Sequence, residues 1–88
     1  MNTVYNIQSS DIKVYPNPAK DLVHVEVSVT AGSNVHLELY NLFGQKLMTT
    51  EVTNNNANFN IAGLPTGSYY IVCYQEGYKK AEALFIKN

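Results

Sequence analysis

The chain has 88 residues, which is enough for one domain with one core but too few for a core plus a deep, separately walled catalytic pocket. An apolar content of 45% with seven tyrosines excludes a disordered tail, and a net charge of −1 argues against a nucleic-acid partner. A single cysteine excludes an internal disulfide framework.

Residues 1–11 contain no apolar block, so no signal peptide is expected in them. We expect this segment to be a flexible linker, followed by one domain over residues 12–88. If the domain works outside the cytoplasm, it must therefore be part of a longer precursor.

Apolar and polar residues alternate with period two along most of the chain. Leu22–Val29 and Val35–Tyr40 show the pattern most clearly. Further strands are expected at Ile12–Tyr15, Lys46–Val52, Asn58–Ile61, Ser68–Gln75 and Lys79–Lys87. Seven short strands, each with one polar face, predict an all-β fold: a two-sheet antiparallel β-sandwich with immunoglobulin-like or Greek-key wiring. The pattern leaves the strand order open.

The turn residues add detail. In Tyr15–Pro18, two residues stand directly before prolines, and neither proline can donate a ladder hydrogen bond, so the first strand should end in a stiff exit at a sheet edge. Asn41–Gly44 predicts a hairpin loop with Gly44 at positive φ. Ala62–Gly67 is predicted to be a crossover in which Leu64 caps the core.

The last two strands allow a test of register. A two-residue turn at Glu76-Gly77, carried through the hairpin, would set the core residue Ile71 opposite Glu82. Since a one-residue shift moves every side chain to the other face, burial favours the shifted register and hence a three-residue loop or a bulge. The pairs expected are Cys73–Ala81, Ile71–Ala83 and Tyr69–Phe85 inside, with Tyr74–Lys80 and Val72–Glu82 outside.

Two histidines raise the question of a metal site. His24 and His36 are expected on outward faces, with Glu26 and Glu38 nearby. If the two strands pair directly, His24 can face Glu38 and His36 can face Glu26; if the strands lie in different sheets, this pairing fails. Zinc needs three or four converging ligands, so we favour solvated surface pairs and expect no metal and no cofactor.

Nothing in the sequence predicts catalysis. Cys73 falls on the predicted inner face without a histidine near it in sequence, which favours a small buried side chain over a nucleophile. Glu26 and Glu38 lie on open faces, without the apolar pocket that tunes a general acid. We expect a protein that is not an enzyme.

Tyrosines are predicted on the outside of the sheets. Tyr70 and Tyr74 should point outward from the penultimate strand, and Tyr40 from another. Such a row could stack sugars, as in carbohydrate-binding modules, or dock a protein, and single surface aromatics are also ordinary. All three interpretations stay open here.

The final strand carries Lys79, Lys80 and Lys87. If this strand is an edge, its lysines would discourage uncontrolled pairing. A partner could also read it by strand addition or by capture of the terminal carboxylate. The sequence does not decide whether two copies pair through such edges.

Taken in order, these segments resemble a known family. Val14–Ala19, the alternating strand after it, Leu39–Leu47, Leu64–Val72 and the lysine-rich last strand are similar to the C-terminal sorting domain of the type IX secretion system, type A. The resemblance runs from about Ile12 to Asn88.

The resemblance implies a secretion signal of Bacteroidetes-type Gram-negative bacteria. It implies a cargo on the N-terminal side that passes through the periplasm and the outer-membrane translocon to the cell surface or the medium. A sortase-like peptidase would then remove the domain at a bond in or before residues 1–11. The alternative is a carbohydrate-binding or adhesive β-sandwich module of a larger secreted enzyme.

The resemblance also carries over candidate recognition positions: Tyr15, Pro16, Asn17, Pro18, Gly44, Leu64, Gly67, Tyr69 and Lys87. Folding alone explains most of them, with glycines for positive φ and prolines for a strand exit. Lys87 and the last strand are predicted to be the contacts, because folding does not obviously require them.

Overall fold

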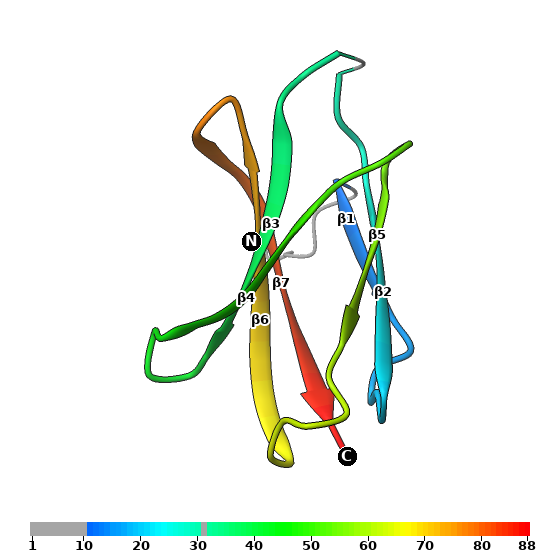
Figure 1. Ribbon diagram of the computed structural model, residues 1–88, viewed down its shortest axis with the longest axis vertical. Coiled ribbons are helices and arrows are strands. Elements are labelled where there is room, and N and C mark those ends of the chain that lie inside the picture. The colour runs from blue at the N-terminus through cyan, green and yellow to red at the C-terminus, as the bar shows by residue number, and fades with distance from the viewer. Residues whose placement is uncertain (1–10, 31) are drawn as a thin grey trace, which may run out of the picture.

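The computed structural model describes residues 11–30 and 32–88, and in this part of the chain every regular element is a strand (Figure 1). The strands are β1 (Ile12–Tyr15), β2 (Leu22–Val27), β3 (Val35–Asn41), β4 (Lys46–Glu51), β5 (Asn56–Asn60), β6 (Gly67–Gln75) and β7 (Tyr78–Lys87). The predicted linker lies outside the described residues except for Asp11.

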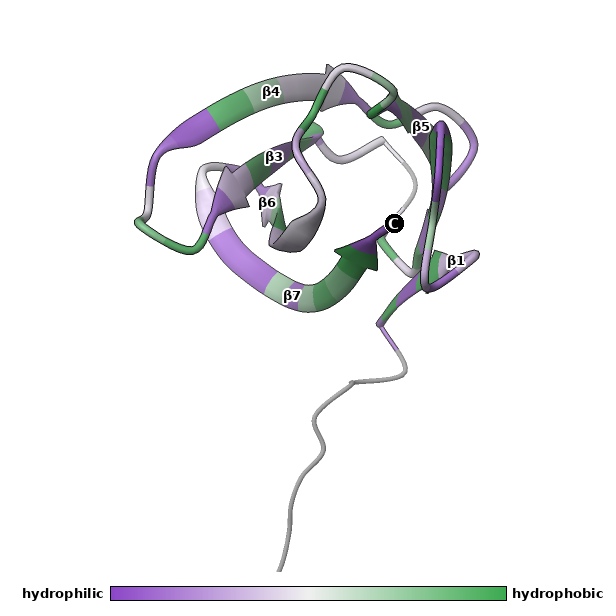
Figure 2. Ribbon diagram, turned by 90° about the horizontal axis from the view of Figure 1, so that it is seen from below, coloured by the Kyte–Doolittle hydropathy of each residue, from purple (hydrophilic) through white to green (hydrophobic). Residues whose placement is uncertain are grey.

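The strands form two antiparallel sheets, which confirms the predicted sandwich. One sheet has the order β1-β2-β5 and the other the order β4-β3-β6-β7. Figure 1 shows the two layers, and Figure 2 shows the four-stranded sheet curving around the core. The chain changes sheet between β2 and β3, between β4 and β5, and between β5 and β6, which is Greek-key wiring.

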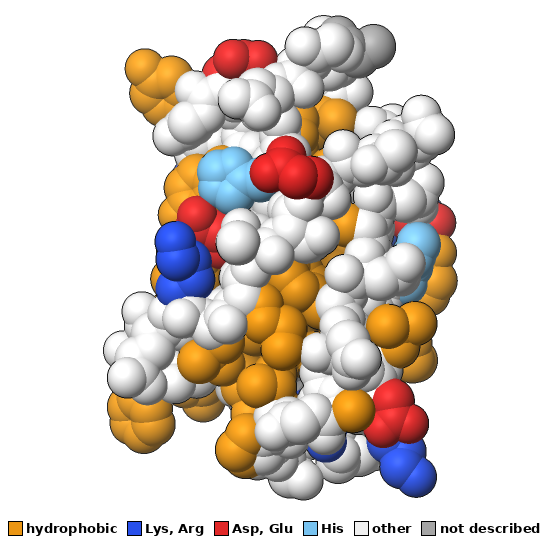
Figure 3. All heavy atoms as spheres, viewed as in Figure 1, with side chains coloured by type: hydrophobic (Ala, Val, Ile, Leu, Met, Phe, Trp, Pro, Cys, Tyr) orange, Lys and Arg blue, Asp and Glu red, His pale blue; other side chains and the backbone are white. Residues whose placement is uncertain are grey.

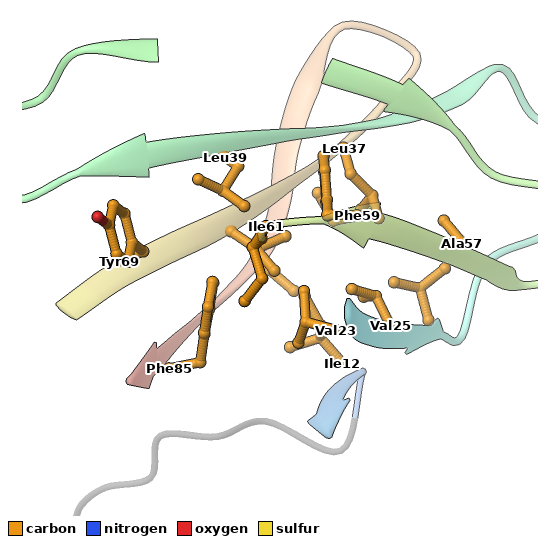
Figure 4. Close-up of a cluster of buried hydrophobic side chains, with 14 of the residues drawn as sticks. Ile12, Val23, Val25, Leu37, Leu39, Ala57, Phe59, Ile61, Tyr69 and Phe85 are labelled. Carbon is orange, nitrogen blue, oxygen red and sulfur yellow. The ribbon is translucent and has the colours of Figure 1, made fainter. Parts of the chain in front are cut away.

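Alternation along each strand supplies the core. Val23, Val25, Leu37 and Leu39 are all 0% exposed, because successive side chains of a strand point to opposite faces. They meet the large side chains of the other strands between the sheets (Figure 4). Phe85 of β7 is also fully buried, so the last strand is part of the core.

Tyr69 closes the start of β6. Its ring stacks on that of Phe85 with 5.8 Å between the centroids. Its hydroxyl donates to the carbonyl of Pro65, four residues upstream, over 2.5 Å. This is the tyrosine-corner arrangement of immunoglobulin-like sandwiches. Leu64 beside it is half-buried against the core, as predicted.

Two strand limits differ from the sequence prediction by two residues, and every other limit agrees to within one residue. β2 ends at Val27, two residues early: the amide of Ser28 makes a last bond to the carbonyl of Asp11, and the chain then leaves for the other sheet. β5 begins at Asn56, two residues early, because Asn54 and Asn55 form the turn before it with φ of 52° and 64°.

The hairpin between β6 and β7 confirms the core register. The inner pairs, the Val72–Glu82 pair and a bulge are as predicted, but Val72, expected outside, is only 4% exposed. The tight turn also exists, since Glu76 and Gly77 both have positive φ and set Gln75 opposite Tyr78. The predicted Tyr74–Lys80 pair is wrong: Tyr74 faces Lys79, because the register shifts between Cys73 and Tyr74. The chain thus keeps both its preferred turn and its buried face, at the cost of one extra residue in β7.

Adjacent residues of β7 test this register. We expect Phe85→Ala to lower the free energy of unfolding by about 3–5 kcal/mol, because a fully buried ring leaves a cavity. Leu84→Ala is the matched control and should stay within about 0.5 kcal/mol, since Leu84 is 57% exposed. Urea unfolding followed by circular dichroism measures both; equal losses would contradict the assigned faces.

Candidate recognition surface

The segment after β1 covers the outer edge of the end of β7. The Asn17 side chain accepts a hydrogen bond from the amide of Ile86 (2.9 Å) and donates one to the carbonyl of Leu84 (3.4 Å). The amide of Ala19 donates to the carbonyl of Ile86, and the amide of Asn88 donates to the carbonyl of Ala19, both over 2.8 Å. One side chain and one backbone residue thus satisfy groups that an open edge would leave to water.

Pro16–Pro18 carries the chain from one sheet to the other. β1 ends at Tyr15 on the edge of the three-stranded sheet, as predicted, and both peptide bonds that precede the prolines are cis. Ala19 then forms a parallel bridge with Lys87 of the four-stranded sheet. The sequence predicted an exit at an edge but not this second pairing.

Lys87 is needed by the fold, so the premise that made it a contact residue is wrong. It is only 9% exposed, it lies opposite Gly67 of β6, and it bridges to Ala19 on its other side. Its parity is that of Phe85, so its aliphatic stem lies on the core face. Whether a partner also contacts Lys87 stays a prediction.

Seven of the nine candidate positions gather around the end of β7, because Gly67 pairs with Lys87 and Tyr69 pairs with Phe85. These seven are Pro16, Asn17, Pro18, Leu64, Gly67, Tyr69 and Lys87. The three in the Pro-Asn-Pro segment are exposed, whereas Tyr69 and Lys87 are buried.

The other two positions lie apart from this group. Tyr15 is 42% exposed on the outer face of the three-stranded sheet. Its hydroxyl donates to Glu26 over 2.6 Å, which raises the pKa of Tyr15. Gly44 closes the β3–β4 turn with φ of 84°, as predicted.

The two histidines do not meet, because β2 and β3 lie in different sheets. His24 lies 2.7 Å from the side-chain oxygen of Asn58 and 2.9 Å from that of Asn56. The direct pairing of His24 with Glu38 is therefore wrong, and the different-sheet alternative holds. Within residues 11–30 and 32–88, no group of three or more histidine, cysteine, aspartate or glutamate side chains could hold a metal ion.

The outward tyrosines stack on neighbours across the strands. The rings of Tyr40 and Tyr70 are 5.5 Å apart at 14°, and those of His36 and Tyr74 are 5.2 Å apart at 15°. Each ring therefore turns one face to its neighbour. This geometry makes two stacked pairs on the outer face of the sheet.

Glu38 organises the polar half of this outer face. It accepts hydrogen bonds from the hydroxyl of Tyr40 and from Nε2 of His36 (3.0 Å), and Nζ of Lys46 lies 3.7 Å away. The Tyr40 bond is the main cause that holds the pKa of Glu38 below its ordinary value, against burial, which raises it. The same bond raises the pKa of Tyr40. The carboxylate is thus held as an anion that orients its neighbours.

Cys73 is 1% exposed on the inner face, as predicted. Burial raises the pKa of its thiol, which keeps it protonated and unreactive.

Four exposed apolar residues on or beside the outer face escaped the sequence analysis: Leu42, Phe43, Leu84 and Ile86. Figure 3 shows hydrophobic side chains protruding at the end of the molecule where the β3–β4 turn lies (lower left). A signal for two of them was present, because placing Phe85 inside sends Leu84 and Ile86 outside.

The cover of β7 predicts a local effect of Asn17. Asn17→Ala should lower the free energy of unfolding by about 1–2 kcal/mol, because the amide of Ile86 loses its partner. Hydrogen exchange by NMR should show faster exchange at Ile86. The control is Asn34→Ala at the other end, where the backbone makes the bonds to Glu76; unchanged exchange at Ile86 would contradict the assigned role.

The Glu38 network predicts a pH dependence. Because the pKa of Glu38 is lowered on folding, its contribution is present above the ordinary value of 4.5 and is lost as the pH falls through the folded pKa. Glu38→Gln should therefore cost about 1 kcal/mol near neutral pH and almost nothing in acid, measured by urea unfolding. Glu51→Gln, on exposed β4, should change little at either pH; a Glu38→Gln cost that is independent of pH would contradict the network.

No helix within the described residues is long and apolar enough to cross a bilayer.

Comparison with known proteins identifies one family. A search of curated proteins found no match to the chain. The family described as the secretion system C-terminal sorting domain matches residues 13–87, which is nearly the whole chain. The chain therefore belongs to the C-terminal sorting domains of the type IX secretion system.

Proposed function

We propose that this domain directs an N-terminal cargo from the periplasm through the outer-membrane translocon of the type IX system and is then removed by a sortase-like peptidase. The family match over residues 13–87 carries the proposal. The cargo ends at the cell surface or in the medium, and the bond that is cut lies in or before residues 1–11.

The fold supports a role as a removable label. A label has to stay folded beside any cargo and expose a constant surface, and it needs no chemistry of its own. The edge of β7 is closed at its end by residues of the same domain, so the label does not depend on the cargo for this closure.

We propose that the translocon contacts the exposed candidate positions first: Tyr15, Pro16, Asn17, Pro18 and Gly44. Leu64, Gly67, Tyr69 and Lys87 then act mainly by holding the end of β7 in place. Lys87 remains a candidate contact, because it bridges to Ala19 directly after the exposed Pro-Asn-Pro segment.

The carbohydrate-binding alternative has no supporting observation of its own. Its aromatic rings are paired across strands rather than spread as a platform. We therefore propose only the sorting function.

A fusion tests the proposal. The 88-residue chain is joined to a folded reporter enzyme that carries an N-terminal export signal, in a host with the type IX system. We expect the reporter on the cell surface or in the medium, shortened by up to the 9.8 kDa of the domain. Reporter held in the periplasm at full length would overturn the proposal, and reporter activity in the periplasm shows that the cargo has folded.

A truncation tests the part played by the end of β7. Deletion of Lys87-Asn88 removes the bond from the amide of Asn88 to Ala19 and should block export while the reporter stays active. Asn17→Ala should reduce export and Asn34→Ala should not. Full export of the truncated fusion would contradict a role for this end in recognition.

A further inference from the structure

The outer face of the four-stranded sheet ends in an apolar patch, which we call the end patch. It consists of Leu42, Phe43, Leu84 and Ile86, which are 62%, 90%, 57% and 45% exposed. Folding does not need these side chains, since none of them belongs to the core. Apolar residues gathered at one end of a face mark an interaction site more often than scattered ones do.

The strand register joins the patch into one surface. Leu84 lies opposite Tyr70, and Tyr70 lies opposite Tyr40 on the next strand. The stacked rings of these tyrosines therefore bridge the outer side of β7 to the β3–β4 turn, which holds Leu42 and Phe43.

The turn presents its two apolar side chains on a rigid base. The side-chain oxygen of Asn41 accepts hydrogen bonds from the backbone amides of Phe43 (2.9 Å) and Gln45 (3.1 Å). The side-chain NH2 group of Asn41 donates to the side-chain oxygen of Gln45 over 2.7 Å. Figure 1 shows this turn projecting from the body of the sandwich. The result is a convex tip rather than a groove.

Lysine side chains lie beside the patch and farther along the same face. Lys46 follows the turn, with its side chain 54% exposed. Two carboxylates on this outer face have lysine partners, Glu38 with Lys46 at 3.7 Å and Glu82 with Lys79 at 2.8 Å, while Glu51 lies at the far end of β4 from the turn. Tyrosine rings border the patch, as they do where proteins meet the headgroup layer of a bilayer.

We propose that the end patch inserts shallowly into the surface of a lipid bilayer that contains anionic headgroups. Exposed leucine and phenylalanine beside lysine are the chemistry of peripheral membrane attachment. A protein partner would need a pocket shaped to the tip and roughly 800 Å² of contact on each side, whereas a bilayer accepts a convex apolar tip without a matching shape. The proposal concerns the domain alone and does not depend on the sorting function.

A tryptophan reporter tests the insertion, because the chain contains no tryptophan. In the 88-residue chain, Phe43→Trp should shift its emission to the blue when vesicles of phosphatidylcholine and phosphatidylglycerol are added. The matched control is Tyr78→Trp, at the first position of β7 and at the other end of the molecule, where the native residue is 80% exposed and the emission should not move. Absence of the shift at position 43, or an equal shift at position 78, would overturn the proposal.

Sedimentation with the same vesicles measures the contribution of each group. Leu42→Ser with Phe43→Ser should weaken binding by roughly tenfold or more. Lys46→Gln should weaken it by about fivefold on anionic vesicles and leave binding to pure phosphatidylcholine unchanged. Circular dichroism checks that each variant is folded. Undiminished binding of the double serine variant would refute the proposal, as would self-association that buries the indole of the Phe43→Trp variant without vesicles.

Discussion

Closure of the outer edge of β7 is the constraint on which the domain depends. The last strand must be present because Phe85 fills the core, yet as an edge strand it offers unpaired amides and carbonyls on its outer side. Asn17 and Ala19 satisfy these groups at the end of the strand. Lys87 lies between the two sides of this strand: it pairs with Gly67 of β6 on one side and bridges to Ala19, after the Pro-Asn-Pro segment, on the other.

This closure gives a physical account of a family pattern at both ends of the domain. Positions far apart in the chain act together because the segment after β1 lies against the end of β7. Asn17 is exposed and Lys87 is buried. The candidate positions therefore include residues that a partner can contact and residues that keep the end of β7 in place.

The outer face of the four-stranded sheet has a polar part and an apolar part. Its middle is a polar network in which Glu38 orients Tyr40 and His36, and its end is apolar. The stacked tyrosines lie at the border and have one covered ring face. The same sheet therefore carries a polar part held by hydrogen bonds and an apolar part whose side chains are exposed.

The sequence by itself determined the strands, the side chains that face the core, and the core register of the last hairpin. These are local or pairwise properties: alternation has period two, and a carboxylate opposite Ile71 is unfavourable wherever the hairpin lies. Only the tertiary structure decided that β2 and β3 lie in different sheets, which separates His24 from His36. It also decided that Asn17 meets Ile86, 69 residues away. Alternation says which face of a strand is buried but not which strand lies beside it, because that choice depends on how the whole chain fills the space between the sheets.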